Sequence, residues 1–428
     1  MPSTTGVSID DCKAQLAANI VKLSNADPLN IIQALSTLDC PGLVGMIEQY
    51  GTLSCERTSF LQALVTTISA ISGPITVQNS TGNYSLPLNL FTHLIGEPGL
   101  IKFVLIIVRK CSVKRKIEIA ILLNTCPVIR HAMTQLDKLF PGVYSKSSRG
   151  RRRTSMVIQS ETELSLSKKM AKVGDIFAIC DEIDTLLTKL SVYSAGERAA
   201  AAGGKIMCQG FDLIEEETRG TVIASQWLEN IRRVHSIKLP VTQMINDGQT
   251  LLTTYTPTSA EFEEDGSYVS AYGLVCRAIK EDLKTANESQ DLKLYIRTFL
   301  RKTGVKLPRY CACMNLLYHS ILWCYEIVDK INFVAGLHAS NQELDMDFVM
   351  GAEALVKRKI EQMPKDSQNR PIMIISKPVV VAAIKLYDFI KQSSINFFSC
   401  DAIERIAIER LVKSTLLKEN AQQLRTNK

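Results

Sequence analysis

Apolar residues recur at helical spacing along most of the chain. In residues 9–23, for example, Ile9, Leu16, Ile20 and Leu23 mark one face of an amphipathic helix. The same pattern predicts further helices over 28–38, 41–50, 57–72, 98–110, 114–124, 127–140, 173–190, 221–235, 268–286, 291–302, 309–335, 343–363, 378–393 and 400–419. The fold is therefore expected to be mainly α.

One stretch breaks this helical pattern. Residues 73–91 alternate apolar and polar side chains around a turn rich in Asn, Ser and Gly. Alternation on both sides of such a turn is typical of two antiparallel strands. The sequence therefore predicts at most a small β-hairpin near 73–91.

The length of the chain predicts two lobes. A single hydrophobic core stops growing near 250–300 residues, and the chain has 428. The segment 246–268 is turn-rich and acidic, with Asn-Asp-Gly at its start and Glu-Glu-Asp-Gly near its end. We therefore expect two helical lobes, an arm and a tail: an N-terminal arm 1–25, a lobe 26–245, the inter-lobe segment 246–268, a second lobe 269–415 and a polar tail 416–428.

The segment 145–168 is predicted to be a mobile basic loop. Its arginines are Arg149, Arg151, Arg152 and Arg153, and serines flank them. Like charges so close together cannot pack in a core. Three functions fit this pattern: a clamp on RNA phosphates, a nuclear-import signal, or a kinase site at Thr154 or Ser155, where phosphorylation would weaken phosphate contacts. An ordinary solvated loop is the fourth interpretation.

A second basic segment follows the predicted lobe boundary. Lys293, Arg297 and Arg301 recur every fourth residue and would form one cationic ridge on a helix. Tyr295, Phe299 and Tyr310 lie among them as candidates for base stacking, and Lys302, Lys306 and Arg309 continue the positive charge. Cations with interleaved aromatic rings are typical of a site for a nucleic-acid strand. The alternative is a solvated amphipathic helix with Leu294, Ile296 and Leu300 facing a core.

Motifs of catalysis and of metal binding are not found. Residues 176–182 resemble the strand-plus-acid motif of a nucleotide hydrolase, but no phosphate loop ending in Gly-Lys-Ser/Thr precedes them, so a helix is the better interpretation. Cys311 and Cys313 would point about 200° apart on a helix, which favours buried structural thiols over metal ligands. No histidine pair has zinc-site spacing, and no nucleophile elbow is present. We expect no enzyme activity, no cofactor and no metal.

Composition narrows the class of protein. The chain is 46% hydrophobic and 22% charged, as globular proteins are, and its formal charge is +7. A nucleic-acid site must therefore come from local clustering of cations. Twelve scattered cysteines and an N-terminus without a signal-peptide pattern predict reduced thiols in the cytosol or nucleus. The most apolar run, 99–108, contains Lys102 and is too short to cross a membrane.

Size, helicity, the order of the predicted lobes and the basic segments on both sides of their boundary resemble the nucleoproteins of negative-strand RNA viruses. The likeness is to plant rhabdovirus-type nucleoproteins and ophiovirus coat proteins. It implies single-stranded RNA held in a basic cleft between the lobes, and flexible arms exchanged between neighbouring subunits. It implies phosphate contacts from the second lobe by Lys293, Arg297, Arg301, Lys302 and Arg309. The matching candidates in the first lobe are Lys102, Arg109, Lys110, Lys114, Arg115 and Lys116.

The same resemblance sets the expected partners. These are single-stranded RNA, further copies of the chain in an oligomer or filament, and a viral polymerase and phosphoprotein, with no membrane. The expected location is the virion and the host cytoplasm, with the nucleus as an alternative. The competing class is a cellular helical scaffold that binds protein partners and is regulated at Thr154 or Ser155.

Overall fold

The computed structural model describes residues 9–24, 29–53, 57–72, 75–78, 85–88, 90, 145–146, 154–155, 157–158, 165, 177–178, 241–246, 249–250, 271–289, 292–330, 346–365 and 371–399. Most of these residues are helical, which confirms the mainly α fold. Outside them lie several predicted helices, at 98–110, 114–124, 127–140, 221–235 and 400–419.

The helices follow the predicted pattern closely. They are α1 (Ile9–Ser24), α2 (Ile31–Leu35) with the 3-10 turn η1 (Ser36–Leu38), α3 (Pro41–Leu53), α4 (Arg57–Ile71), α11 (Ala271–Glu288), α12 (Leu294–Arg301), α13 (Thr303–Lys330), α14 (Met346–Gln362) and α15 (Lys377–Phe398). The largest difference is at α13, which begins at Thr303 and runs through Pro308. Because Pro308 stands near the start of α13, its missing N–H costs a single hydrogen bond of the helix.

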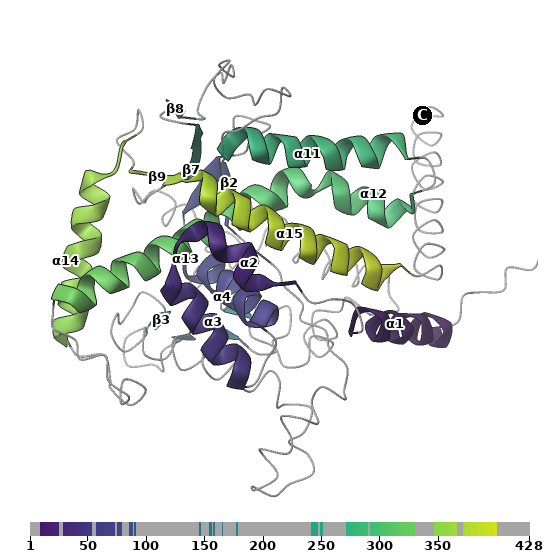
Figure 1. Ribbon diagram of the computed structural model, residues 1–428, viewed down its shortest axis with the longest axis horizontal. Coiled ribbons are helices and arrows are strands. Elements are labelled where there is room, and N and C mark those ends of the chain that lie inside the picture. Colours follow the sequence, from purple (N-terminus) through teal and green to yellow (C-terminus); the bar gives the residue numbers. More distant parts are fainter. Residues whose placement is uncertain are drawn as a thin grey trace, which may run out of the picture.

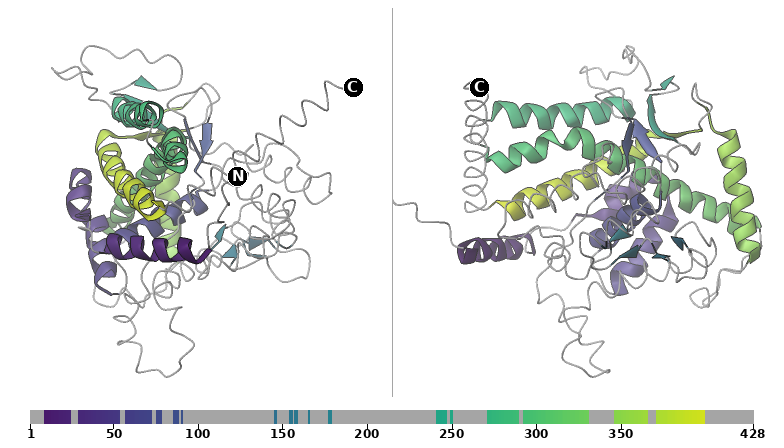
Figure 2. Two further views of the ribbon diagram at one scale, coloured as in Figure 1. Left: turned by 90° about the vertical axis from the view of Figure 1, so that its right-hand side faces the viewer. Right: turned by 180° about the vertical axis from the view of Figure 1, so that it is seen from behind.

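Helix α13 is central to the described part of the molecule. All residues from 307 to 317 are buried, and Leu307, Cys311 and Met314 are fully inaccessible. On one side of it lie α11, α12 and α15, and on the other side lie α3 and α4, while α2 and η1 pack against α15 (Figures 1 and 2). The far end of α13 carries α14, where Glu326 pairs with Arg358 at 3.1 Å and with Lys359 at 2.8 Å.

The predicted hairpin is present but belongs to a larger sheet. Strands β1 (Thr76–Gln78) and β2 (Ser85–Pro87) pair antiparallel. Strand β7 (Val241–Asn246) lies parallel to β1, and β9 (Ile372–Ile375) lies parallel to β7. A short strand β8 (Gln249–Thr250) folds back on β7. The prediction of at most a hairpin is therefore wrong, because parallel strands from distant parts of the chain complete the sheet.

One hydrophobic core joins segments from both sides of the predicted lobe boundary. Leu61 and Val65 of α4 belong to the same cluster as Met314 of α13 and Val380 of α15. Strand β7 comes from the chain just before the boundary and pairs with β1 from the first half and with β9 from the second half. A basic cleft between two separate lobes is therefore not confirmed by the described residues.

Helix α1 packs against the C-terminal end of α15. The Asn19 amide donates hydrogen bonds to the carbonyl oxygens of Phe397, at 2.9 Å, and Ser399, at 3.2 Å. The last carbonyls of a helix lack partners within the helix, so Asn19 supplies a cap from another element. None of the α1 residues whose side chains the structure describes belongs to the main core.

Short strands lie within and after the predicted loop 145–168. Strand β3 (Ser145–Lys146) pairs antiparallel with β4 (Thr154–Ser155), and β5 (Val157–Ile158) pairs parallel with β6 (Phe177–Ala178). The helix predicted over 173–190 is therefore wrong at Phe177 and Ala178. A short apolar run fits a strand as well as a helix, and here a distant partner decides between them.

Candidate nucleic-acid interface

The predicted cationic ridge is only partly helical. Helix α12 begins at Leu294, and Lys293 precedes it with extended backbone angles (φ −53°, ψ 142°). Arg297 and Arg301 are one turn apart on α12 and share one flank of that helix. The regular row of three cations therefore reduces to a pair, with Lys293 at its entrance.

Both arginines of this flank are oriented by hydrogen bonds. The Arg297 Nε donates to the Leu292 carbonyl oxygen at 2.9 Å, and the Arg301 Nη2 donates to the Asn287 Oδ1 at 3.1 Å. Arg301 is exposed and Arg297 is half-buried. Each guanidinium has five N–H donors, so further donors remain after these neutral contacts. An anion at this surface would meet two cations that the fold already positions.

A second basic group forms where α12 passes into α13. Phe299 is about 200° from Arg297 around the helix, so its ring lies on the opposite flank. Lys306 places its Nζ 3.7 Å from the centre of that ring, and Lys302 is exposed between the two helices. Burial, together with the positive charge of Lys302, lowers the pKa of Lys306 to about 8.

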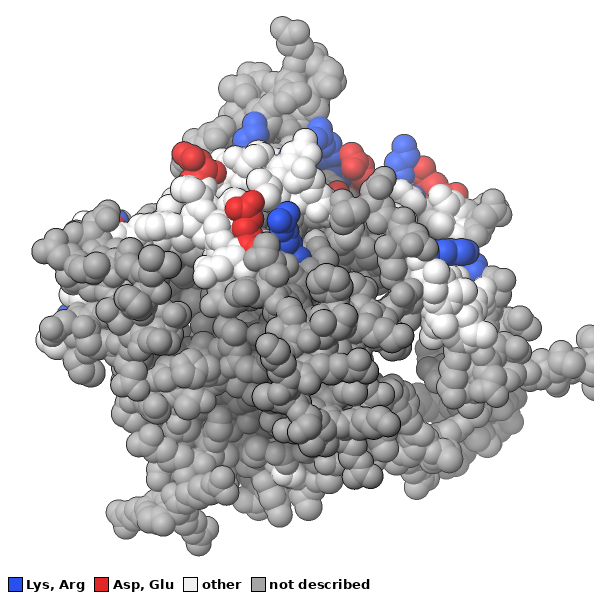
Figure 3. All heavy atoms as spheres, turned by 60° about the horizontal axis from the view of Figure 1, so that its bottom comes forward, with Lys and Arg blue, Asp and Glu red and all other residues white. Residues whose placement is uncertain are grey.

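We use the term "junction cations" for Arg297, Arg301, Lys302 and Lys306. None of the four forms an ion pair with an acidic side chain in the part of the chain that the structure describes. On the face drawn in Figure 3, the described Lys and Arg lie among Asp and Glu. The junction cations are therefore four positive charges within ten residues of the chain, without a counter-charge among the residues that the structure describes.

The sequence predicted that Arg309 and Tyr310 extend the cationic surface, and this prediction is wrong. The exposed fraction of Arg309 is 0% and that of Tyr310 is 4%. The Tyr310 hydroxyl donates to the Gln62 Oε1 at 3.0 Å, and its ring lies 6.2 Å from that of Tyr387. Both residues fall in the stretch 307–317 of α13, which is buried on every face of the helix. Neither is open to a nucleic-acid strand in this structure.

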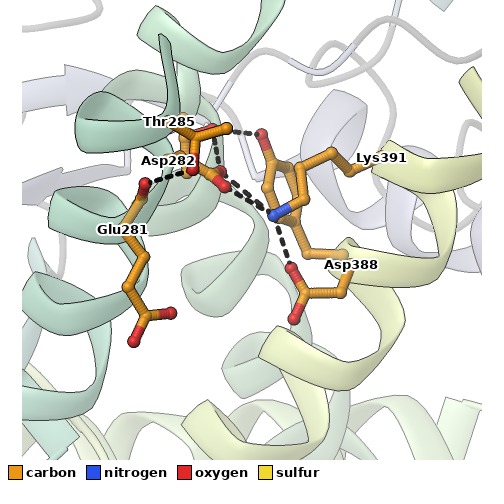
Figure 4. A network of polar contacts seen from close by, with 7 residues as sticks. Glu281, Asp282, Thr285, Asp388 and Lys391 are labelled. Carbon is orange, nitrogen blue, oxygen red and sulfur yellow. Dashed lines mark hydrogen bonds and ion pairs between the residues drawn. The ribbon is translucent and has the colours of Figure 1, made fainter. Parts of the chain in front are cut away.

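A polar network fixes the start of α13, and with it the junction (Figure 4). The Asp282 carboxylate of α11 accepts hydrogen bonds from the Thr303 Oγ1 at 2.7 Å and from the Lys391 Nζ at 2.8 and 3.1 Å. Lys391 also pairs with Asp388 at 2.8 Å, and the Tyr387 hydroxyl donates to the Thr303 Oγ1 at 3.4 Å. Burial alone would lower the pKa of Lys391, but its hydrogen bonds to the two carboxylates raise it. Since Thr303 follows Lys302 directly, the network sets where the basic side chains emerge.

The remaining predicted site residues lie outside this arrangement. Thr154 and Ser155 form β4, and Tyr295 lies in α12 with its side chain outside the described atoms. The other predicted cations lie outside the described residues: Lys102, Arg109, Lys110, Lys114, Arg115, Lys116, Arg149, Arg151, Arg152 and Arg153.

Two features of the site were missed by the sequence-based reasoning. The contact of Lys306 with Phe299 spans the break between two helices, where the regular spacing of one helix no longer applies. The Asp282–Lys391 pair joins residues 109 positions apart, and no sequence spacing predicts such a contact. Only the amphipathic period of α11 and α15 carries a signal, because it places both polar residues near the core-facing side.

The described residues contain neither a metal site nor a helix that could span a membrane. They contain no group of three His, Cys, Asp or Glu side chains that could hold a metal ion. Burial raises the pKa of the Cys311 thiol to about 12, so this thiol is kept protonated. No helix in the described part of the chain is both long enough and apolar enough to span a membrane.

Comparison of the chain with protein-family models, with curated proteins and with solved structures finds no match.

Proposed function

We propose that this protein is a viral nucleoprotein that binds and encapsidates single-stranded RNA through its phosphates. The observation that carries the proposal is the group of four junction cations, gathered within ten residues and without an acidic partner in the described residues. Nucleic-acid phosphates are the abundant cellular anion that such a group binds, and contacts to phosphates carry no sequence preference.

The arrangement of donors supports a strand rather than a single small anion. The two arginines and the two lysines lie on different flanks of α12, so one compact anion cannot contact all four. Successive phosphates of a flexible strand can do so, and the Phe299 ring between the lysines suits an unpaired base. In the full proposal the opposing wall is formed by the first-lobe cations between Lys102 and Lys116, across a cleft.

The docking of α1 supports assembly into a polymer. Asn19 caps two carbonyls at the end of α15, and α1 makes this contact at the edge of the molecule (Figure 1). The same cap can be supplied by α1 of a second copy, which exchanges identical contacts between subunits. Exchanged arms would then link subunits along the RNA, in the virion and in the host cytoplasm or nucleus, where polymerase and phosphoprotein are the further partners.

The direct test is purification of the full chain from a heterologous host. The ratio of absorbance at 260 and 280 nm and the mass by size-exclusion chromatography are recorded before and after RNase treatment. The proposal predicts a high ratio and a large assembly that RNase dissolves. A monomer of 47.5 kDa with a protein-like ratio, which also fails to bind added RNA, would contradict it and favour the protein scaffold.

A matched pair of variants then locates the binding surface. Arg297→Glu with Arg301→Glu should abolish RNA co-purification and leave helical content unchanged, since both side chains contact only neutral groups of the fold. Lys377→Glu with Lys385→Glu changes the net charge equally at two exposed positions of α15. That control should retain RNA. Equal losses in both variants would show a general charge effect and remove α12 from the proposal.

A further inference from the structure

The ring of Phe299 is covered on one face by the chain's own Lys306. The Lys306 ammonium lies 3.7 Å from the ring centre, and both side chains are half-buried. Burial and the charge of Lys302 lower the pKa of Lys306 to about 8, so the group is still mostly protonated at neutral pH. A charged ammonium over an aromatic face is held there by cation–π attraction.

This contact blocks the use that the ring would have in RNA binding. A nucleobase stacks on an aromatic side chain face to face, so it cannot use the ring face of Phe299 that Lys306 occupies. The cover is made of a long and flexible side chain. The ring is carried by α12, and two residues after α12 ends Thr303 at the start of α13 donates a hydrogen bond to Asp282. The ammonium can therefore leave while the ring stays.

We propose that Lys306 is a displaceable cover of a base-stacking platform: when single-stranded RNA binds, the ammonium moves from the Phe299 ring to a phosphate, and a nucleobase takes its place. This inference rests on the RNA binding proposed above. It assigns Lys306 two successive partners and makes Phe299 available only to a ligand that brings both a phosphate and a base.

The exchange is favourable on both sides. A base stacked on an aromatic ring is held more strongly than a partly exposed cation–π contact, and an ammonium on a phosphate gains a charge-assisted hydrogen bond. Lys302 repels Lys306 in the free protein, and this repulsion is relieved when a phosphate lies between them. A nucleobase without a phosphate provides no anion for Lys306, so the ammonium should stay on the Phe299 ring.

The test uses the full chain and a short single-stranded RNA that carries one 2-aminopurine, whose fluorescence falls when it stacks. The wild type should quench the probe on binding. Phe299→Leu should bind with an affinity within about tenfold of the wild type, because the phosphate contacts remain, but should lose most of the quench. Lys306→Met should keep the quench and lose about threefold to tenfold in affinity, the share of one phosphate contact. Lys385→Met, at an exposed position of α15, should match the wild type in both.

The outcomes separate this inference from the proposed function. If the wild type binds no RNA, the proposed function is contradicted, and the cover with it. If the wild type binds and Phe299→Leu quenches as well as the wild type, only the platform is overturned. If Lys306→Met loses the quench as completely as Phe299→Leu, the lysine holds the base in place and does not give way to it.

A measurement on the unmutated side chains guards against a variant that folds poorly. Reductive methylation with ¹³C-formaldehyde keeps lysines charged and labels each with NMR-visible methyl groups. The Lys306 signal, identified by its loss in Lys306→Arg, should be shifted by the Phe299 ring current in the free protein. Saturating RNA should move it to the position of exposed lysines. A signal that stays ring-shifted in the complex would overturn the displacement.

Discussion

Two polar clusters lie near the start of α13. They differ in whether their positive charges have acidic partners. Around Asp282, the half-buried Lys391 is matched by two carboxylates, to both of which it donates hydrogen bonds. At the junction cations, four positive side chains gather, and none pairs with an acid among the described residues. The charge of Lys391 is balanced by two carboxylates of the same chain. A group of cations left without such a counter-charge points to an anion from outside the chain.

The clusters also differ in what they connect. The Asp282 cluster joins α11, α13 and α15, so its loss should loosen the described core. The junction cations contact only nearby backbone, an amide and a ring. Their removal should leave the core unchanged. Stability and RNA binding should therefore respond to different substitutions, and five experiments can test this division.

The largest effect is expected at the paired cluster. Asp282→Ala leaves Lys391 mostly buried with one carboxylate and removes the partner of Thr303, so the free energy of unfolding should fall by about 3 kcal/mol. Urea denaturation measures this. Asp388 is half exposed, and Asp388→Ala should cost only about 0–1 kcal/mol. Equal effects of the two substitutions would show that burial of the pair does not set its contribution.

The pH dependence of this pair has a defined sign. The folded pKa of Lys391 is raised, so its contribution is fully present below its unfolded pKa near ~10.4 and is lost as the pH rises through the folded pKa. The stability difference between Asp282→Ala and the wild type should therefore be constant from pH 6 to 9. A difference that shrinks within this range would assign the stabilisation to another group.

The next effect is expected in the salt dependence of RNA binding. Each phosphate contact contributes about 0.7 to the slope of log affinity against log salt for single strands, so Arg297→Gln with Arg301→Gln should lower the slope by roughly 1.4. Fluorescence anisotropy over a range of KCl concentrations measures it. An unchanged slope with unchanged affinity would place the phosphates elsewhere on the protein.

A smaller effect is expected from pH. Because a bound phosphate favours charged Lys306, RNA affinity should be full below about pH 8 and should decline as the pH rises past this value. Lys306→Arg keeps its charge throughout this range and should flatten the profile. A wild-type profile that is flat from pH 7 to 9.5 would show that Lys306 does not contact the RNA charge.

The smallest effect is expected from Lys302→Gln. Removing this neighbouring charge should raise the pKa of Lys306 toward its usual value, so the decline in RNA affinity should begin at a higher pH. The affinity at pH 7 should fall only about twofold to threefold, since one exposed cation is lost. A decline that begins at the wild-type pH would separate Lys306 from the influence of Lys302.

Much of the fold could be predicted from sequence because helical periodicity is a local signal. The helices from 9 to 72 and from 271 to 398 appear where apolar residues recur at helical spacing. The strands β7 and β9 were missed because their pairing joins residues more than a hundred positions apart, although the Ile372–Ile375 run is typical of a buried strand. The packing of α4 with α13 and α15 in one cluster was missed because chain length does not tell which distant segments pack together.

The site was predictable in part for the same reason. Arg297 and Arg301 follow from the period of one helix, and both lie on its accessible flank. Arg309 and Tyr310 were misplaced because residues 307–317 of α13 are buried on every face by packing against other elements, and a local sequence pattern does not contain that packing. The pairing of Lys306 with Phe299 depends on the angle between two helices, and no pattern within one helix contains that angle.

The central claim is that the junction cations and the Phe299 ring contact RNA. Ultraviolet crosslinking of the full-length protein to single-stranded RNA, followed by mass spectrometry of the crosslinked peptides, tests it most directly. Crosslinks are expected within residues 293–306, above all at Phe299. RNA that is bound and crosslinked at other segments, with none in this stretch, would contradict it.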